Sequence, residues 1–115
     1  MAIDQNCLFC KIIAGEIPAQ CIYSNEELVA FADIAPQAPT HILLVPRVHV
    51  ENSAELASVA PLALAALHTG ASEIARREKL DSYRLVFNTG AGAGQSVFHA
   101  HLHLLGGRSF AWPPG

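Results

Sequence analysis

Three histidines near the end of the chain, His99, His101 and His103, alternate with alanine and leucine. Successive side chains of a β-strand point to opposite faces, so this spacing places the imidazoles on one face and the apolar side chains on the other. Neighbouring imidazoles would lie roughly 6.6 Å apart, close enough to flank one small anionic group. A helix would scatter the same side chains around its axis. The run therefore predicts a strand over residues 99–105 with a chemically active face and a core face.

The composition is that of a folded globular domain. Of 115 residues, 51% are hydrophobic and 15% are charged, which excludes a disordered chain and allows one domain over 1–115 with its own core. So few charged residues leave little polar surface, which favours a buried subunit interface. The net charge of −3, without a broad basic patch, argues against a nucleic acid partner.

Cysteine usage and the apolar runs indicate a cytoplasmic protein. The three cysteines, Cys7, Cys10 and Cys21, are an odd number and do not suit the disulfide framework of a secreted domain. No apolar run approaches the ~18 residues that cross a membrane, and the N-terminus lacks a signal-peptide pattern. We therefore expect a cytoplasmic protein without a membrane partner.

Turn residues divide the rest of the chain into short helices and strands. We expect a short helix over 7–14, a hairpin of strands over 21–23 and 28–32, a buried strand over 41–45, a long helix that begins near 61 in the Ala- and Leu-rich stretch 53–80, and a strand over 83–88. Together with the histidine strand, these elements predict an α+β meander. The sheet should be antiparallel, with its helices on one face.

A glycine-rich segment over 89–95 leads directly into the histidine run. It has too many glycines for regular structure, and its backbone N–H groups can form a concave anion site. A flexible connection is the alternative for a glycine loop taken alone. Joined to Ser96 and the imidazole face, the loop becomes a candidate phosphate site. A His-x-His pair also holds zinc in hydrolases, so a catalytic metal is the competing interpretation.

Phosphoryl chemistry suits the residues of this candidate site. Backbone donors and an imidazolium can neutralise the charge that develops on phosphoryl oxygens. A neutral imidazole can attack phosphorus, and a phosphorus–nitrogen intermediate replaces one difficult step with two easier ones. Packed imidazoles cannot all be charged, which helps to keep one of them neutral. His101 has a histidine partner on each side and is the natural nucleophile.

The run from His99 resembles the His-φ-His-φ-His-φ-φ signature of the histidine triad (HIT) nucleotide hydrolases and transferases. Further segments extend the resemblance over nearly the whole chain, with similarity to the Hint branch near its end: 9–18, 31–41, 94–97, 106–108 and 112–115. The resemblance implies a homodimer in which two five-stranded antiparallel sheets join into a ten-stranded sheet. It also implies hydrolysis of purine nucleoside phosphoramidates, such as adenosine 5′-monophosphoramidate. A dinucleoside polyphosphate hydrolase, a nucleotidyl transferase and a noncatalytic nucleotide-binding module remain alternatives.

The resemblance also implies roles for individual residues. Catalysis would use His101 as nucleophile and His103 at the phosphate. His41 would support the histidine cluster, and Ser96 would lie near the leaving group. The implied nucleotide-binding set is Phe9 and Ile34 near the base, Asp33 at the ribose, Asn88 and Gln95 on the phosphate side, and Gly94, Ser96, Val97, His101 and His103. Asp33 could instead cap a turn, His41 could merely begin a strand, and Asn88 could instead bond to loop backbone.

The pair Cys7-x-x-Cys10 is half of a tetrahedral zinc site. A redox pair is one alternative, although no thioredoxin-like βαβ pattern surrounds these residues, and two ordinary unpaired cysteines are another. The resemblance to bacterial histidine triad proteins implies that His49 and His99 complete the ligand set. Structural zinc would tie the first helix to the sheet and add folding energy. His99 would then take no part in the chemistry, and catalysis would require no cofactor.

Overall fold

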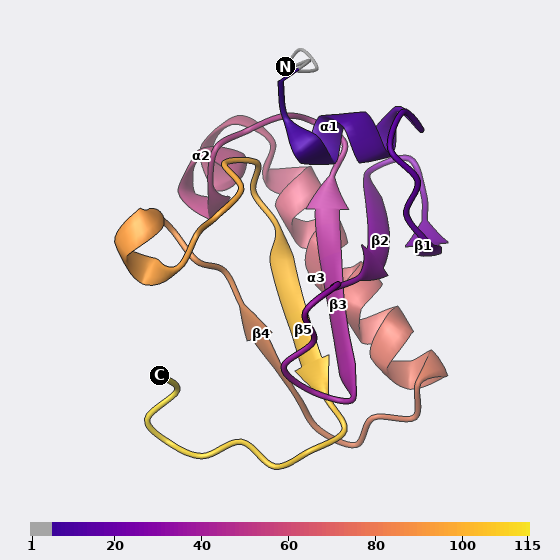
Figure 1. The fold of residues 1–115 in the computed structure, drawn as a ribbon, viewed down its shortest axis with the longest axis vertical. Helices are drawn as coiled ribbons and strands as arrows, with labels where there is room; N and C mark the ends of the chain where they lie inside the picture. Colours follow the sequence, from indigo (N-terminus) through magenta and orange to yellow (C-terminus); the bar gives the residue numbers. More distant parts are fainter. Residues whose placement is uncertain (1–5) are drawn as a thin grey trace.

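An antiparallel sheet lies at the centre of the protein, in a computed structural model that describes residues 6–115 (Figure 1). The elements of this part of the chain are, in order, α1 (Leu8–Ile13), β1 (Cys21–Ser24), β2 (Leu28–Ala32), β3 (Thr40–Pro46), α2 (Ser53–Val59), α3 (Pro61–Arg77), β4 (Tyr83–Val86), the 3-10 turn η1 (Ala91–Ala93) and β5 (Leu102–Gly106). Helix α2 is separate from α3 because Ala60, directly before a proline, leaves the helical conformation. Within residues 6–115, no helix is long and apolar enough to cross a membrane.

The strand order of the sheet is β1-β2-β3-β5-β4, and every neighbouring pair is antiparallel. The α+β architecture is confirmed, but the order departs from a simple meander because β5 lies between β3 and β4. Strands β3 and β4 run in the same direction, since both are antiparallel to β5. Their connection therefore has to cross one face of the sheet, which α2 and α3 do. The crossover leaves room for β5, where His103 is paired with Leu43 of β3.

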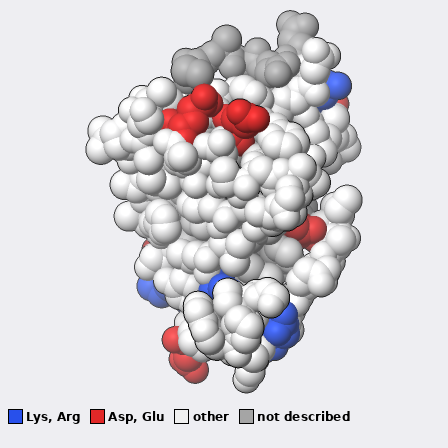
Figure 2. Space-filling model, turned by 90° about the vertical axis from the view of Figure 1, so that its left-hand side faces the viewer, with Lys and Arg blue, Asp and Glu red and all other residues white. Residues whose placement is uncertain are grey.

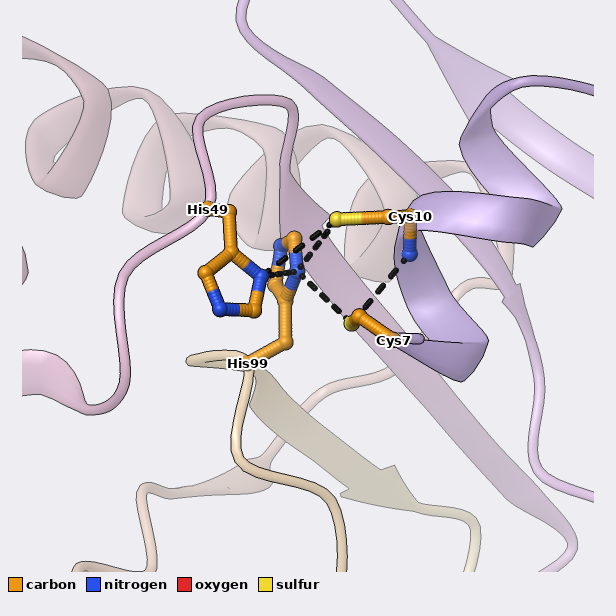
Figure 3. Close-up of side chains that lie close together, drawn as sticks. All are labelled: Cys7, Cys10, His49 and His99. Atoms are coloured by element: carbon orange, nitrogen blue, oxygen red, sulfur yellow. Dashed lines mark hydrogen bonds between the residues drawn. The ribbon is translucent and has the colours of Figure 1, made fainter. Parts of the chain in front are cut away.

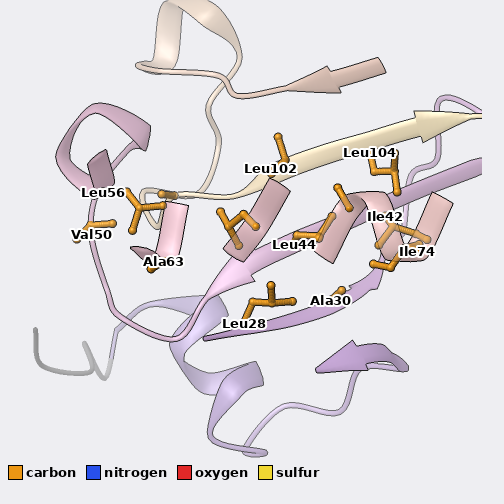
Figure 4. Packing of buried hydrophobic residues seen from close by; sticks show 13 residues of the cluster. Leu28, Ala30, Ile42, Leu44, Val50, Leu56, Ala63, Ile74, Leu102 and Leu104 are labelled. Atoms are coloured by element: carbon orange, nitrogen blue, oxygen red, sulfur yellow. The ribbon is translucent and has the colours of Figure 1, made fainter. Parts of the chain in front are cut away.

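The main core lies between α3 and one face of the sheet (Figure 4). Its buried residues are Leu28, Ala30, Ile42, Leu44, Val50, Leu56, Ala63, Leu67, Ala71, Ile74, Ala100, Leu102 and Leu104. The three apolar residues that alternate with the triad histidines, Ala100, Leu102 and Leu104, are at most 1% exposed. This confirms the predicted core face. Burial of each such leucine contributes about 1.5–3 kcal/mol, so the packing fixes which face of the segment carries the histidines.

Helix α1 covers the opposite face of the sheet, so the expectation that all helices share one face is wrong. Its residues form a second cluster with the alternate side chains of β2 and β3: Cys7, Phe9, Cys10, Val29, Phe31, Leu43 and Val45. Cys7 caps the helix, because its Sγ accepts a hydrogen bond from the backbone N–H of Cys10. A helix of only six residues covers one end of this face. The rest of the face is left for a site.

Strand β5 begins at Leu102, later than the histidine spacing predicts. The backbone before it turns away from β3, because the N–H of Ala100 donates to the carbonyl of Val50 at 2.8 Å. His99 and His101 therefore lie just before the regular ladder, and His103 lies within it. The loop between β3 and α2, rather than a neighbouring strand, holds this segment in place.

We expect Gly107→Ala to destabilise the protein by about 2–5 kcal/mol, measured by urea unfolding. Gly107 follows β5 with φ +89°, and a Cβ built there would lie 2.9 Å from Cβ of Pro39. The left-handed conformation and the close contact both penalise a side chain. Gly15→Ala is the matched control, because Gly15 has φ +80° and no described atom within 4 Å of such a Cβ. Equal losses in the two variants would argue against the Pro39 contact.

Candidate active site and metal centre

A groove of about 610 Å³ lies beside α1, the end of β2 and the segment that precedes β5. Its lining is mostly apolar, and its volume lies within the range of about 300–1,000 Å³ typical of ligand pockets. Most of the residues predicted to bind nucleotide line this groove: Phe9, Asp33, Ile34, Gly94, Ser96, Val97, His101 and His103. Residues from separate parts of the chain therefore meet at one concave surface.

Sequence reasoning missed most of the apolar wall of the groove. The additional lining residues are Leu8, Ile12, Ile17, Pro18, Ala19, Gln20, Phe31, Ala32 and Leu43. The sequence shows that most of them are apolar, but such residues usually pack in a core. Their role in a groove depends on the placement of α1 on the far face of the sheet, which no local pattern indicates.

His101 is held in one tautomer by the backbone. Its Nδ1 lies 2.8 Å from the carbonyl oxygen of His99, and because a carbonyl only accepts, Nδ1 carries the hydrogen. Nε2 therefore carries a lone pair when the ring is neutral. Burial lowers the pKa of His101, although the bond to His99 and the carboxylate of Asp33 oppose this shift. The edge of Phe9 packs against the ring, with centroids 5.0 Å apart.

His41 and His103 form a directed hydrogen-bond chain. The backbone N–H of Gln37 donates to Nδ1 of His41 at 3.0 Å, so a neutral His41 carries its hydrogen on Nε2. That nitrogen lies 2.9 Å from Nδ1 of His103, which therefore accepts. The remaining nitrogen of a neutral His103, Nε2, is then a donor. Burial first, and then the neighbouring His101 and His41, lower the pKa of His103 to about 4.

Asp33 combines the two roles considered for it from the sequence. Its Oδ1 accepts a hydrogen bond from the N–H of Ala35 at 2.8 Å, which is the contact of a turn cap. Its Oδ2 lies 3.5 Å from Nε2 of His41, and the residue also lines the groove. The carboxylate is thus beside both the turn after β2 and the histidine pair.

Asn88 and Gln95 do not line the groove. The Gln95 side chain is buried, and its Oε1 accepts from the N–H of Gly90 at 2.9 Å. Its Nε2 donates to the carbonyls of Glu51 and Val97 at 2.7 and 3.1 Å. Gln95 therefore holds the glycine loop together from inside. The loop is also more regular than expected, because η1 forms within it.

Cys7, Cys10, His49 and His99 converge on one point between α1, the loop after β3 and the segment before β5 (Figure 3). Their nearest Sγ and ring nitrogen atoms all lie within 4.8 Å of one another. Nδ1 of His99 lies 3.4 Å from Sγ of Cys7 and 3.6 Å from Sγ of Cys10. Nδ1 of His49 lies 3.3 Å from Sγ of Cys10 and 3.1 Å from Nδ1 of His99.

These donors fit a tetrahedral zinc ion. With Zn–S of about 2.3 Å and Zn–N of about 2.0 Å, neighbouring ligand atoms are about 3.3–3.8 Å apart, close to the distances found here. The orientation of His99 also fits, because its Nε2 donates to the carbonyl of Pro46 at 2.8 Å and leaves Nδ1 unprotonated toward the cysteines. His99 is fully buried and does not line the groove. The triad histidines thus belong to two neighbouring sites.

A second group, Asp33, His41 and His103, also brings ligand atoms within 4.8 Å of one another. Three of its four ring nitrogens already have hydrogen-bond partners, since Nδ1 of His41 accepts from Gln37 and Nε2 of His41 donates to Nδ1 of His103. The hydrogen on Nε2 of His41 occupies the position a metal would need. The Cys/His cluster is therefore the better metal site of the two.

An open antiparallel sheet, with a run of three alternating histidines of which His101 and His103 line a groove, defines a class of α+β proteins built around a histidine triad. The family model described as HIT domain matches residues 14–110, and the chain belongs to this family. A HIT family hydrolase from Legionella pneumophila has a similar crystal structure, with a TM-score of 0.89 and 49% identity, over 96% of this chain and 100% of that one.

Two relatives have names that describe a property. The purine nucleoside phosphoramidase of Escherichia coli (strain K12) is 44% identical over 103 residues, which cover 88% of this chain and 87% of that protein. The 14 kDa zinc-binding protein of Zea mays is 45% identical in an alignment that covers 97% of this chain and 90% of that protein. The homologues of this chain therefore include hydrolases.

Proposed function

We propose that the protein hydrolyses the P–N bond of purine nucleoside 5′-phosphoramidates through a nucleotidyl-histidine intermediate. One observation carries the proposal: Nδ1 of His101 donates to the carbonyl of His99 at 2.8 Å, so Nε2 bears the lone pair beside a nucleotide-sized groove. Burial favours the neutral imidazole, which is the form that attacks phosphorus. The name of the 44% identical Escherichia coli relative supports the same chemistry.

In the proposed reaction, Nε2 of His101 attacks the α-phosphorus, and the bond between phosphorus and the amine breaks. The amine leaves as it gains a proton from solvent, with the hydroxyl of Ser96 beside it. Nε2–H of His103 donates to a phosphoryl oxygen and offsets the charge that develops there. A water molecule then attacks phosphorus, the phosphorus–histidine bond breaks, and the nucleoside monophosphate is released.

The proposed substrate contacts follow the groove from base to phosphate. The purine lies near Phe9 and Ile34, and the ribose hydroxyls bond to Asp33. The glycine loop meets the phosphate through Gly94 and Val97. Asn88 and Gln95 support this contact from outside the groove lining, and Gln95 does so through its bonds to the loop backbone.

We also propose a structural zinc ion at Cys7, Cys10, His49 and His99. Bound there, the ion would cross-link α1 to the loop after β3 and to the segment before β5, and would supply folding energy rather than chemistry. The name of the 45% identical Zea mays relative, a zinc-binding protein, supports the assignment. Thiolate ligands suit the reducing cytoplasm, which is the proposed location.

A homodimer is the proposed assembly, with two β4 strands paired into a ten-stranded sheet. Within residues 6–115, β4 pairs with β5 alone and keeps its outer edge open. The face shown in Figure 2, which is the left-hand side of Figure 1, has an uncharged centre, with acidic groups above it and at its right-hand margin. Leu62 and Trp112 are exposed by 81% and 84% and would be covered in an interface. Light scattering should give twice the mass of one chain, and a monomer at micromolar concentration would contradict the proposal.

A substrate panel with intact-protein mass spectrometry tests the proposed activity. Adenosine 5′-monophosphoramidate should be converted to AMP, and protein quenched in alkaline denaturant should carry one nucleotidyl group. Faster cleavage of dinucleoside polyphosphates would favour a polyphosphate hydrolase, and transfer to a second phosphate acceptor would favour a nucleotidyl transferase. Nucleotide binding without turnover or adduct would point to a noncatalytic module.

We expect the acidic limb of the kcat/KM profile to lie below pH 6.5, the usual pKa of a histidine. The pKa of His103 is lowered to about 4, and burial also lowers the pKa of His101. A lowered pKa means that each imidazole stays neutral below the usual value of a histidine. A pH–rate profile, with a substrate that does not itself ionise in this range, measures the position of the acidic limb.

Asp33→Asn should move this acidic limb to still lower pH. The carboxylate of Asp33 raises the pKa of both His101 and His103, so its removal favours their neutral forms further. Ile34→Ala changes the same wall of the groove without a change of charge and is the matched control. An acidic limb at or above pH 6.5 in the wild type, or an upward move in Asp33→Asn, would contradict these assignments.

A further inference from the structure

We propose that the metal cluster positions the catalytic nucleophile, with His99 as the positioning residue that links the two sites. This inference rests on the proposed function, because it concerns how the nucleophile of that reaction is held. The imidazole of His99 lies in the cluster, while its backbone carbonyl accepts the Nδ1–H of His101 at 2.8 Å. One residue thus contributes a side chain to one site and a backbone group to the other.

The side chain of His99 is anchored on both edges of its ring. Nδ1 faces the two cysteines at 3.4 and 3.6 Å, and Nε2 donates to the carbonyl of Pro46 at 2.8 Å. The ring has no exposed surface. A metal ion bound at Nδ1 would therefore add a strong bond to a ring that already has one fixed orientation.

The sheet ladder does not hold the backbone at His99. β5 begins at Leu102, so the carbonyl of His99 lies outside the sheet ladder and is held through neighbouring contacts. The N–H of Ala100 donates to the carbonyl of Val50, in the loop that also provides His49. The cluster would join this loop to His99 directly, and so fix the position of the carbonyl that His101 needs.

Phe9 provides a second connection between the sites. It lies in α1 between Cys7 and Cys10, so a metal held by both cysteines would also fix its place. Its ring packs edge-on against His99, with centroids 6.0 Å apart, and against His101, with centroids 5.0 Å apart. Both the hydrogen-bond acceptor and the packing partner of the nucleophile thus depend on cluster residues.

Loss of the metal should therefore change the tautomer of His101 and slow the chemical step. If the His99 carbonyl moves, Nδ1–H loses its acceptor, and the ring also populates the form with hydrogen on Nε2. That form has its lone pair on Nδ1 and none on Nε2, the atom proposed to attack phosphorus. Because most of the groove lining lies outside α1, the change should affect kcat more than KM.

The test compares the full-length wild-type protein in three states: loaded with zinc, stripped with a chelator, and reloaded. Nitrogen-15 spectra of the histidine rings report the tautomer of His101, with its signals assigned by comparison with His101→Gln. We expect the Nδ1–H form alone in the zinc-loaded protein and a mixture after stripping. We also expect kcat to fall by about 10-fold or more, with KM within about 3-fold, and both readouts to recover on reloading.

Matched variants separate coupling from general loss of structure. Cys10→Ser should reproduce the stripped protein, whereas Cys21→Ser, which changes an exposed cysteine outside the cluster, should behave as the wild type. If stripping merely unfolded a fraction of the molecules, the folded signals would keep the Nδ1–H tautomer, and the inference would be wrong. An unchanged tautomer with full kcat would also overturn it. A zinc-dependent tautomer in a protein that neither turns over nor forms the adduct would support the coupling and overturn the proposed function.

Discussion

His101→Ala is expected to lower the turnover of a nucleoside phosphoramidate by at least about 10³-fold, while AMP still binds. Alanine removes Nε2, the atom that forms the bond to phosphorus, and the variant has no second route to the intermediate. Nucleotide affinity should change little, because Phe9, Asp33 and Ile34 still line the groove. Steady-state kinetics and calorimetry with AMP measure the two effects separately.

His103→Ala is the informative comparison for this variant. It removes a donor to the phosphoryl oxygens but keeps the nucleophile, so turnover should fall by about 10²–10³-fold and the adduct should still form. Turnover of His101→Ala within tenfold of the wild type would show that His101 is not the nucleophile. An adduct in His101→Ala that is absent in His103→Ala would transfer that role to His103.

The alternation of the histidine run predicted its two faces correctly, because a segment that buries one face has apolar residues at every second position. Ala100, Leu102 and Leu104 all pack in the main core, as their alternation with histidine indicates. The start of the strand was not predictable in the same way. It depends on a hydrogen bond between Ala100 and Val50, and backbone groups leave no trace in the residue types.

Local sequence patterns also could not predict where whole helices and strands pack. The apolar stripe of α1 predicts a helix but gives no face of the sheet, and the structure packs Phe9 opposite to α3. Likewise, an antiparallel sheet can be built from hairpins alone, or from a crossover that leaves space for a later strand. The sequence does not distinguish the two, so the position of β5 between β3 and β4 requires the tertiary structure. The groove exists because the placement of α1 and the position of β5 leave part of one sheet face uncovered.

In the candidate site, too, the identity of many residues could be predicted, whereas their hydrogen-bond partners could not. Residue types and family resemblance together indicated the four cluster residues and eight of the seventeen residues that line the groove, but they missed most of its apolar wall. They could not indicate tautomers, because the backbone groups that set them belong to His99, Gln37 and Pro46. They also gave no indication that the amide of Gln95 bonds to the backbone on both sides of the loop.

The second large effect concerns the metal: we expect about one zinc ion per chain, and a stability that rises with free zinc. A site that forms only in the folded protein adds about 1.4 kcal/mol to the free energy of unfolding for each tenfold rise in zinc above the dissociation constant. At 1,000 times that constant, the added stability is about 4.1 kcal/mol. Metal analysis of reduced protein and urea unfolding at several zinc concentrations measure both quantities.

Cys10→Ser separates the loss of the metal from the loss of packing around it. The variant should not bind zinc tightly, because serine removes one soft ligand from a small, buried site. Its free energy of unfolding should therefore be independent of zinc and lie within about 1 kcal/mol of that of the chelated wild type. Cys21→Ser, at an exposed position, should keep both the metal and the zinc-dependent slope. A wild-type stability that does not respond to zinc, or reduced protein without metal, would leave Cys7 and Cys10 as ordinary buried thiols. A zinc-dependent slope retained in Cys10→Ser would instead place the ion elsewhere, because three remaining ligands cannot reproduce the affinity of a closed four-ligand site.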